Sequence, residues 1–213
     1  MDKNIKRSCI DCAVINCDRM EKMYPDFCPT VAMDEKTIED VTALYIEDEE
    51  NSKFAICAAE VEAENYCSMT RVEEIAEFAR KIGAQKLGIA TCVGLISEAR
   101  VAAKIFRHHG FEVFGISCKA GAQPKSAVGI KLDPEVAAKV GGNMCNPIMQ
   151  ATLLNEKETD LNIVIGLCVG HDSLFYKYSD AMCTTLVTKD RVLGHNPVAA
   201  LYQADSYYSK LLK

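Results

Sequence analysis

The sequence has no excess of positive charge. Its 24 lysines and arginines stand against 30 aspartates and glutamates, for a formal net charge of -6. Nucleic-acid-binding domains carry a basic patch, so this balance argues against nucleic acid as a partner. The polar start, Met1–Arg7, leads into no apolar segment, and we expect no secretory signal. No apolar run reaches bilayer-spanning length. These absences predict a soluble, cytoplasmic protein with no membrane partner.

Two common nucleotide-binding motifs are also missing. Neither G-x-G-x-x-G nor G-x-x-x-x-G-K-[ST] occurs in the chain, so the usual dinucleotide and P-loop sites lack support. Tryptophan is absent as well, whereas cysteine is abundant, with 11 residues. Because thiols seldom form structural disulfides in a reduced compartment, this abundance points to metal binding or thiol chemistry.

Four of the cysteines are gathered near the N-terminus. Cys9, Cys12, Cys17 and Cys28 have the spacing C-x2-C-x4-C-x10-C. Thiolates repel one another unless a cation neutralises them, so we expect residues 1–33 to form a metal knuckle, with little room for regular helices. A set of redox thiols is the alternative. Four thiolates suit an iron–sulfur cluster or tetrahedral zinc. We expect an iron–sulfur cluster, of the 4Fe-4S type, because further cysteines follow along the chain.

Residues 34–213 are expected to form an α/β domain that begins with a helical segment, 34–83. Short apolar runs then alternate with helical patterns, which favours a doubly wound, mostly parallel sheet of about four strands with flanking helices. The expected strands are 86–91, 111–117, 161–167 and 184–188. Helices are expected to be capped at Thr37, Asn51 and Thr70, to span 95–109 and 172–178, and to begin at Asp133-Pro134, Asn146-Pro147 and Asn196-Pro197.

A second group of cysteines follows the expected strands. Cys92, Cys118 and Cys168 come at or just beyond strand ends, and Cys145 precedes a helix start. In an open parallel sheet, ligands bind beyond the carboxyl ends of the strands. We therefore expect these thiols to converge at the carboxyl edge of the sheet, as a redox or sulfur-chemistry site or as a second metal or cluster site. Ordinary core packing is the alternative, because free cysteine behaves as a small apolar residue.

Two similar segments support this expectation. Gly88–Gly94 and Ile165–Gly170 each end a strand with Cys-Val-Gly. Gly94 and Gly170 lack a Cβ and would let a ligand approach the backbone closely. His171, just after the second segment, suits a metal ligand, an acid/base group or part of a helix cap.

The remaining candidates have simpler explanations. Arg191 and His195 could face an anion at the same edge, but a polar turn explains them better. Cys183 precedes its expected strand rather than following one. Cys57 and Cys67 lie in or beside helices and are expected to be packing residues.

The chain resembles a known family. The cysteine-rich start, Gly88–Gly94 and the stretch Gly166–Ser179 are similar to bacterial and archaeal proteins classified as family 1847 among the domains of unknown function. The likeness covers nearly the whole chain. It implies metal binding through Cys9, Cys12, Cys17 and Cys28, and it brings no established reaction and no known catalytic residues.

Two functional hypotheses follow. In the first, an iron–sulfur protein passes electrons between the N-terminal knuckle and a cysteine-lined carboxyl edge, with a redox partner protein. In the second, the chain is a non-enzymatic zinc-binding or metal-handling module. The sequence leaves open whether the protein is an enzyme.

Overall fold

A computed structural model describes residues 7–19, 21 and 23–213, which fall into two compact units. The first ends at Ile56 and the second is Cys57–Lys213. The boundary expected after residue 33 falls inside the first unit and stays a prediction.

The first unit is mainly helical. The 3-10 helix η1 (Cys9–Asp11) and the short helix α1 (Pro29–Ala32) lie in the cysteine-rich segment, where no regular element was expected. Helix α2 (Glu35–Glu47) begins before the predicted cap, because the Asp34 carboxylate accepts the Thr37 N–H at 2.8 Å. Helix α3 (Glu49–Asn65) also begins earlier than Asn51 and continues into the second unit.

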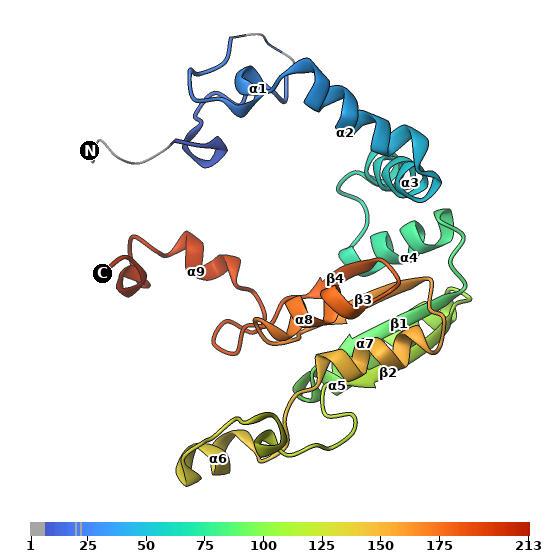
Figure 1. The fold of residues 1–213 in the computed structure, drawn as a ribbon, viewed down its shortest axis with the longest axis vertical. Coiled ribbons are helices and arrows are strands. Elements are labelled where there is room, and N and C mark those ends of the chain that lie inside the picture. The colour runs from blue at the N-terminus through green and yellow to red at the C-terminus, as the bar shows by residue number, and fades with distance from the viewer. Residues whose placement is uncertain (1–6, 20, 22) are drawn as a thin grey trace. The chain divides into compact units, whose positions relative to one another are not determined.

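The second unit is built on a four-stranded, all-parallel sheet. Its strands are β1 (Lys86–Thr91), β2 (Glu112–Ser117), β3 (Leu161–Ile165) and β4 (Cys183–Val187), in the order β2-β1-β3-β4. Strands β1 and β3 are almost wholly buried, as expected for central strands of a parallel sheet. The predicted α/β class is confirmed (Figure 1).

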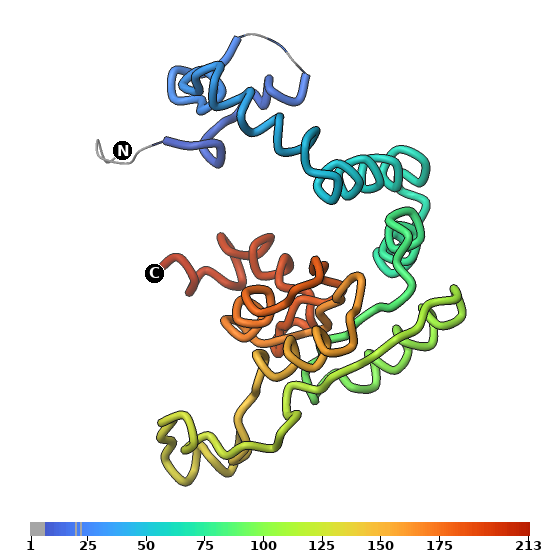
Figure 2. The backbone as a smooth tube through the Cα atoms, turned by 45° about the vertical axis from the view of Figure 1, so that its right-hand side comes forward, coloured from blue at the N-terminus to red at the C-terminus, as the bar shows by residue number. Residues whose placement is uncertain are grey.

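Three helices connect the strands. Helix α5 (Ile96–His108) joins β1 to β2, α7 (Pro147–Asn155) joins β2 to β3, and α8 (His171–Tyr178) joins β3 to β4. Figure 2 traces the backbone by colour from green (β1) to red (the C-terminus). After β1 the chain forms β2 on one side of β1, and it then crosses to the other side of β1 to form β3 and β4. This reversal creates a topological switch point between β1 and β3, where open α/β sheets bind ligands at the carboxyl ends of the strands.

Apolar residues on alternating positions bury both faces of the sheet. Ala90 and Val164 pack with Ala151 and Leu154 of α7 and with Phe175 of α8. Because side chains alternate along a strand, the neighbouring positions Leu87, Ile89 and Ile163 face the other side, and they are fully buried.

Helix α4 (Arg71–Lys81) precedes the sheet. The predicted capping box is present, since Thr70 N–H and hydroxyl both meet the Glu73 carboxylate. The remaining elements are η2 (Val93–Leu95), η3 (Lys125–Val128), α6 (Pro134–Val140), α9 (Val198–Tyr202) and η4 (Ser209–Leu212). In the part of the chain that the structure describes, no helix has the length and apolar character needed to cross a membrane.

Candidate functional site

Two predicted cysteines are neighbours across the sheet. Thr91, the last residue of β1, pairs with Ser117, the last residue of β2, so Cys92 and Cys118 continue the same register. The Cys118 N–H donates to the Thr91 carbonyl at 2.8 Å, which extends the ladder by one bond. Adjacent strands lie about 4.8 Å apart, and disulfides join Cα atoms roughly 4.4–6.8 Å apart. The backbone therefore holds these two thiols at a spacing that a disulfide can bridge.

The pKa values of the two thiols are shifted in opposite directions. The hydrogen bond from the Cys118 thiol is the largest influence that lowers the pKa of Cys92, against the opposing effect of burial. The same hydrogen bond, together with burial, raises the pKa of Cys118. Coupled groups lose their protons as a pair, so the first proton leaves this pair at lower pH than it leaves an ordinary thiol. Cys92 then carries the charge and Cys118 remains a thiol.

Backbone amides and a lysine stabilise that charge. The Gly94 N–H and the Lys189 ammonium both help to lower the pKa of Cys92, and the Val93 N–H donates to Cys118 Sγ at 3.3 Å. A Cβ on Gly94 would lie 3.9 Å from Cys92 Sγ and 3.7 Å from Lys189 Nζ. Glycine at this position keeps the space around the thiolate and the ammonium open.

Helix α7 forms hydrogen bonds with the ends of β1 and β2, and together these bonds act as a clamp. Its N-cap residue Asn146 donates its N–H to the Cys118 carbonyl at 2.7 Å. The Gln150 side-chain amide donates to the carbonyls of Thr91 and Ile116 at 3.1 and 2.7 Å. Gln150 is fully buried, and its Oε1 has no hydrogen-bond partner among the residues that the structure describes. The clamp fixes the backbone that carries both thiols.

Of the other predicted cysteines, Cys145 lies near the Cys92–Cys118 pair, whereas Cys168 and Cys183 have other surroundings. Cys145 is half-buried against the apolar cluster that contains Cys92 and Cys118, and its charge contributes to the raised pKa of Cys118. Cys168 has a different partner: its Sγ accepts a hydrogen bond from Arg191 Nη2 at 2.9 Å. Cys183 is not a residue that precedes a strand, because it is the first residue of β4, at the amino end of the sheet.

His171 and Gly170 begin helix α8. Gly170 is the N-cap with φ +80°, a left-handed conformation that favours glycine. The His171 N–H donates to the Cys168 carbonyl at 2.9 Å. This contact fits the helix-cap alternative for His171, and a role in acid/base chemistry or metal binding stays a prediction.

The N-terminal cysteines are free thiols. Cys9 and Cys17 are exposed, and Cys12 and Cys28 are half-buried. A hydrogen bond with the Thr30 side chain lowers the pKa of Cys28, which favours the thiolate that metals bind. Four thiols suit iron–sulfur or zinc, but over residues 7–19, 21 and 23–213 no three His, Cys, Asp or Glu residues are placed to share a metal ion. Metal sites of this kind form together with the bound ion, so the ligand set stays a prediction.

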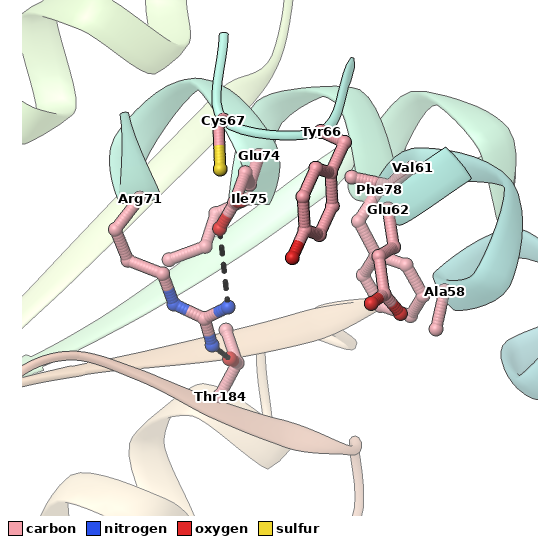
Figure 3. Close-up of a pocket in the computed structure, with 10 residues that line it drawn as sticks. All are labelled: Ala58, Val61, Glu62, Tyr66, Cys67, Arg71, Glu74, Ile75, Phe78 and Thr184. Carbon is pink, nitrogen blue, oxygen red and sulfur yellow. Dashed lines mark hydrogen bonds and ion pairs between the residues drawn. The ribbon is translucent and has the colours of Figure 1, made fainter. Parts of the chain in front are cut away.

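A cavity of about 570 Å³ lies away from these thiols. It is lined by residues of α3 and α4, by Tyr66 and Cys67 between these helices, and by Thr184 near the amino end of β4. Arg71 crosses it, bonding to Thr184 Oγ1 at 2.8 Å and pairing with Glu74 at 3.6 Å (Figure 3). Arg71 is thus already paired, and the cavity lies near the amino end of β4, away from the thiols at the carboxyl ends of the strands.

Sequence reasoning missed two residues at the carboxyl edge, Lys189 and Gln150. Lys189 comes just after β4, so its position at the end of a parallel strand was a usable signal. Gln150 lies in the apolar stretch of α7, where a buried polar residue that contacts two strands has no local sequence signature.

These features define a class: a doubly wound, parallel α/β protein with two neighbouring thiols at the carboxyl ends of its strands. The chain belongs to the family described as "Protein of unknown function (DUF1847)", whose model matches residues 28–186. It is 46% identical over 177 residues to "Uncharacterized protein MJ0455" of Methanocaldococcus jannaschii, covering 82% of this chain and 89% of that protein. The predicted family is confirmed, and metal binding stays a prediction. The matched range includes Cys28, Cys92, Cys118, Cys145 and Cys168, and it ends before Lys189.

Proposed function

We propose that the carboxyl ends of β1 and β2 form a dithiol redox site. Cys92 is the attacking thiolate and Cys118 is the resolving thiol. The observation that supports this assignment is geometric: β1 and β2 hold Cys92 and Cys118 at neighbouring positions, and Lys189 Nζ and Cys92 Sγ lie 3.7 and 3.9 Å from the point where a Gly94 Cβ would stand. The Cys118 thiol and the Lys189 ammonium both lower the pKa of Cys92. Thiolate, rather than thiol, is the nucleophile in disulfide exchange, and this arrangement places the thiolate on one defined residue.

The chemistry is thiol–disulfide exchange. The Cys92 thiolate attacks one sulfur of a substrate disulfide, the substrate S–S bond breaks, and a mixed disulfide forms at Cys92. The departing thiolate takes the proton of Cys118. The Cys118 thiolate then attacks Cys92 Sγ and releases the second substrate thiolate. The substrate gains two electrons, and the protein keeps a Cys92–Cys118 disulfide.

Repeated turnover requires a reductant for that disulfide, and we propose a redox partner protein with a dithiol in the cytoplasm. An iron–sulfur cluster bound at Cys9, Cys12, Cys17 and Cys28 would supply one-electron transfer. Cys145, half-buried near Cys118, extends the sulfur-lined surface and is a candidate auxiliary thiol.

The pH dependence of alkylation tests the assignment of the thiolate. Because the pKa of Cys92 is lowered, its thiolate persists at pH values where an ordinary thiol, with a pKa of about 8.5, is protonated. We expect alkylation of Cys92 by iodoacetamide to change little between about pH 6 and 8, whereas an unperturbed thiol slows roughly tenfold per pH unit below its pKa. Peptide mass spectrometry after timed quenching measures the rate at each cysteine.

Cys183 provides the control in the same digest. Burial raises the pKa of Cys183, so its alkylation should become slower at neutral pH and should rise steeply with pH. If Cys92 showed the same steep rise as Cys183, the pair would not carry a thiolate at neutral pH and the dithiol mechanism would be wrong.

The four free thiols near the N-terminus, of which Cys9 and Cys17 are exposed, favour metal binding. An iron–sulfur cluster there would serve the redox function, whereas zinc would make the chain a metal-handling module, which is the second candidate function. Protein purified without oxygen is expected to contain iron and acid-labile sulfide in equal amounts. Serine at both Cys9 and Cys12 should reduce this content by more than about half, because the cluster loses two of its four thiolates. The Cys57→Ser variant, altered at a buried cysteine of α3, is the control. One zinc per chain without sulfide would favour the metal-handling function instead.

A further inference from the structure

The loop after β4 lies across the carboxyl ends of the central strands. The Gly166 N–H, just after β3, donates to the Val187 carbonyl at 2.7 Å and ties the two strand ends together. A Cβ on Gly166 would lie 3.7 Å from Lys189 Cδ, and one on Gly94 would lie 3.7 Å from Lys189 Nζ. The Lys189 side chain therefore passes from the end of β3 to the end of β1, across the switch point of the sheet.

Internal hydrogen bonds fix the shape of this loop. The Asp190 carboxylate accepts the N–H groups of Val192 and Leu193, each at 2.8 Å. The Asp190 N–H donates to His195 Nδ1 at 3.1 Å, and the His195 N–H donates to the Asp190 carbonyl at 2.9 Å. His195 thus stabilises a polar turn, as the sequence analysis favoured. The turn positions Lys189 and Arg191, the two cations that flank Asp190.

Lys189 and Arg191 lie beside two different thiols, those of Cys92 and Cys168. Lys189 Nζ lies beside Cys92 Sγ, since the two atoms are 3.7 and 3.9 Å from the point where a Gly94 Cβ would stand, and Arg191 donates to Cys168 Sγ at 2.9 Å. Neither cation forms an ion pair with a carboxylate among the described residues. A guanidinium has five N–H donors, and Arg191 is exposed. Its remaining donors are available to an anion in solution, and their fork geometry suits carboxylate, sulfonate or phosphate oxygens.

The thiol pair is buried, but exposed residues border it in the sequence. Cys92 is only 7% exposed, whereas Val93 and Val169 are 49% and 95% exposed. Exposed Gly94 and Gly170 add no side chains to the entrance. A compact group such as one disulfide sulfur can reach the thiolate, while a charged group attached to it would remain near the loop.

We propose that Lys189 and Arg191 select anionic disulfides, in which a carboxylate, sulfonate or phosphate lies a few bonds from the S–S bond. The inference rests on the proposed dithiol function and specifies its substrate class. The anionic group of the substrate binds Arg191 and is attracted by the charge of Lys189, while the Cys92 thiolate attacks a sulfur of the substrate disulfide. The disulfide itself is the oxidant, so one equivalent is reduced for each Cys92–Cys118 disulfide formed.

Two probes of opposite character test the proposal. 5,5′-Dithiobis(2-nitrobenzoate) carries a carboxylate on each ring, and 4,4′-dithiodipyridine is neutral at pH 7. The reduced full-length protein is mixed with either probe and quenched in acid, and mass spectrometry measures the rate at which the Cys92–Cys118 disulfide peptide forms. Arg191→Gln should slow the reaction with the anionic probe about tenfold, the effect of losing one charge-assisted hydrogen bond. Its rate with the neutral probe should stay within about twofold.

Further variants separate charge from structure. Arg191→Lys keeps the charge and should recover part of the lost rate with the anionic probe only. Arg100→Gln, at an exposed arginine of α5, should behave like the parent protein with both probes. If Arg191→Gln slowed the reactions with both probes equally, Arg191 would only position a thiol. If it slowed neither reaction, the site would not select anions. Either result would overturn the inference and leave the dithiol function intact. Absence of the Cys92–Cys118 disulfide with both probes would overturn the dithiol function and this inference with it.

Discussion

The Cys92→Ser variant is expected to lose the rapid reduction of small disulfides by the protein, with a fall in rate of more than about 100-fold. The serine hydroxyl is not ionised at neutral pH, and the remaining thiol, Cys118, has a raised pKa. The hydroxyl can still accept from the Gly94 N–H and from Lys189, so the local hydrogen bonds are retained. Stopped-flow absorbance of the released aromatic thiolate, with peptide mass spectrometry, measures the loss.

Cys118→Ser should behave differently from Cys92→Ser. Cys92 remains a nucleophile there, but no thiol resolves the mixed disulfide, so one probe half should stay attached to Cys92. Cys183→Ser, at the amino end of the sheet, is the matched control and should keep the fast phase. A fast phase that survived in Cys92→Ser and vanished in Cys183→Ser would place the reactive thiol elsewhere.

Phe106→Ala is expected to lower the free energy of unfolding of the α/β unit by about 3–5 kcal/mol. Phe106 is 0% exposed, and the other buried residues of α5 are alanines: Ala99, Ala102 and Ala103. The phenyl ring therefore supplies most of the apolar volume that α5 contributes to the core. Small neighbouring side chains cannot refill the space, and a loss of this size is a large part of the roughly 5–15 kcal/mol that stabilises a typical domain.

Urea denaturation followed by circular dichroism, in a reducing buffer, measures this loss. Val101→Ala on the same helix is the control, because Val101 is 60% exposed and surface substitutions change stability by less than about 0.5 kcal/mol. If the chain unfolds in two steps, the step of the Cys57–Lys213 unit should shift. Equal shifts for the two variants would contradict the structure's placement of Phe106 in the core.

Much of the secondary structure could be predicted because its signals are local. The apolar run 86–91 was predicted as a strand and forms β1. The Thr70–Glu73 capping box was predicted and is present. The helical region was expected from residue 34, where α2 begins, but its cap is Asp34 and not Thr37, because the Asp34 carboxylate accepts the Thr37 N–H. Competing caps a few residues apart are decided by small energy differences.

The candidate site was predictable only in part. Parallel strands bring their carboxyl ends to one edge, which is why Cys92, Cys118 and Cys168 were expected together. The strand order then decided which thiols meet. Cys118 meets Cys92 because β2 pairs with β1 in register, whereas Cys168 follows a turn at Gly166 after β3 and bonds to Arg191.

Local sequence patterns were enough to predict the α/β class, the position of each central strand and a cysteine at or just beyond the end of each of β1, β2 and β3. These depend on apolar runs, caps and glycines within a few residues of one another. By contrast, three features of the site depend on the fold as a whole: the pairing of Cys92 with Cys118, the contacts of Gln150 with both strands, and the approach to Cys92 of Lys189, 97 positions further along the chain. The physical reason is that these contacts depend on strand order and loop path, which are set by the packing of the whole sheet and its helices, and no local pattern encodes them.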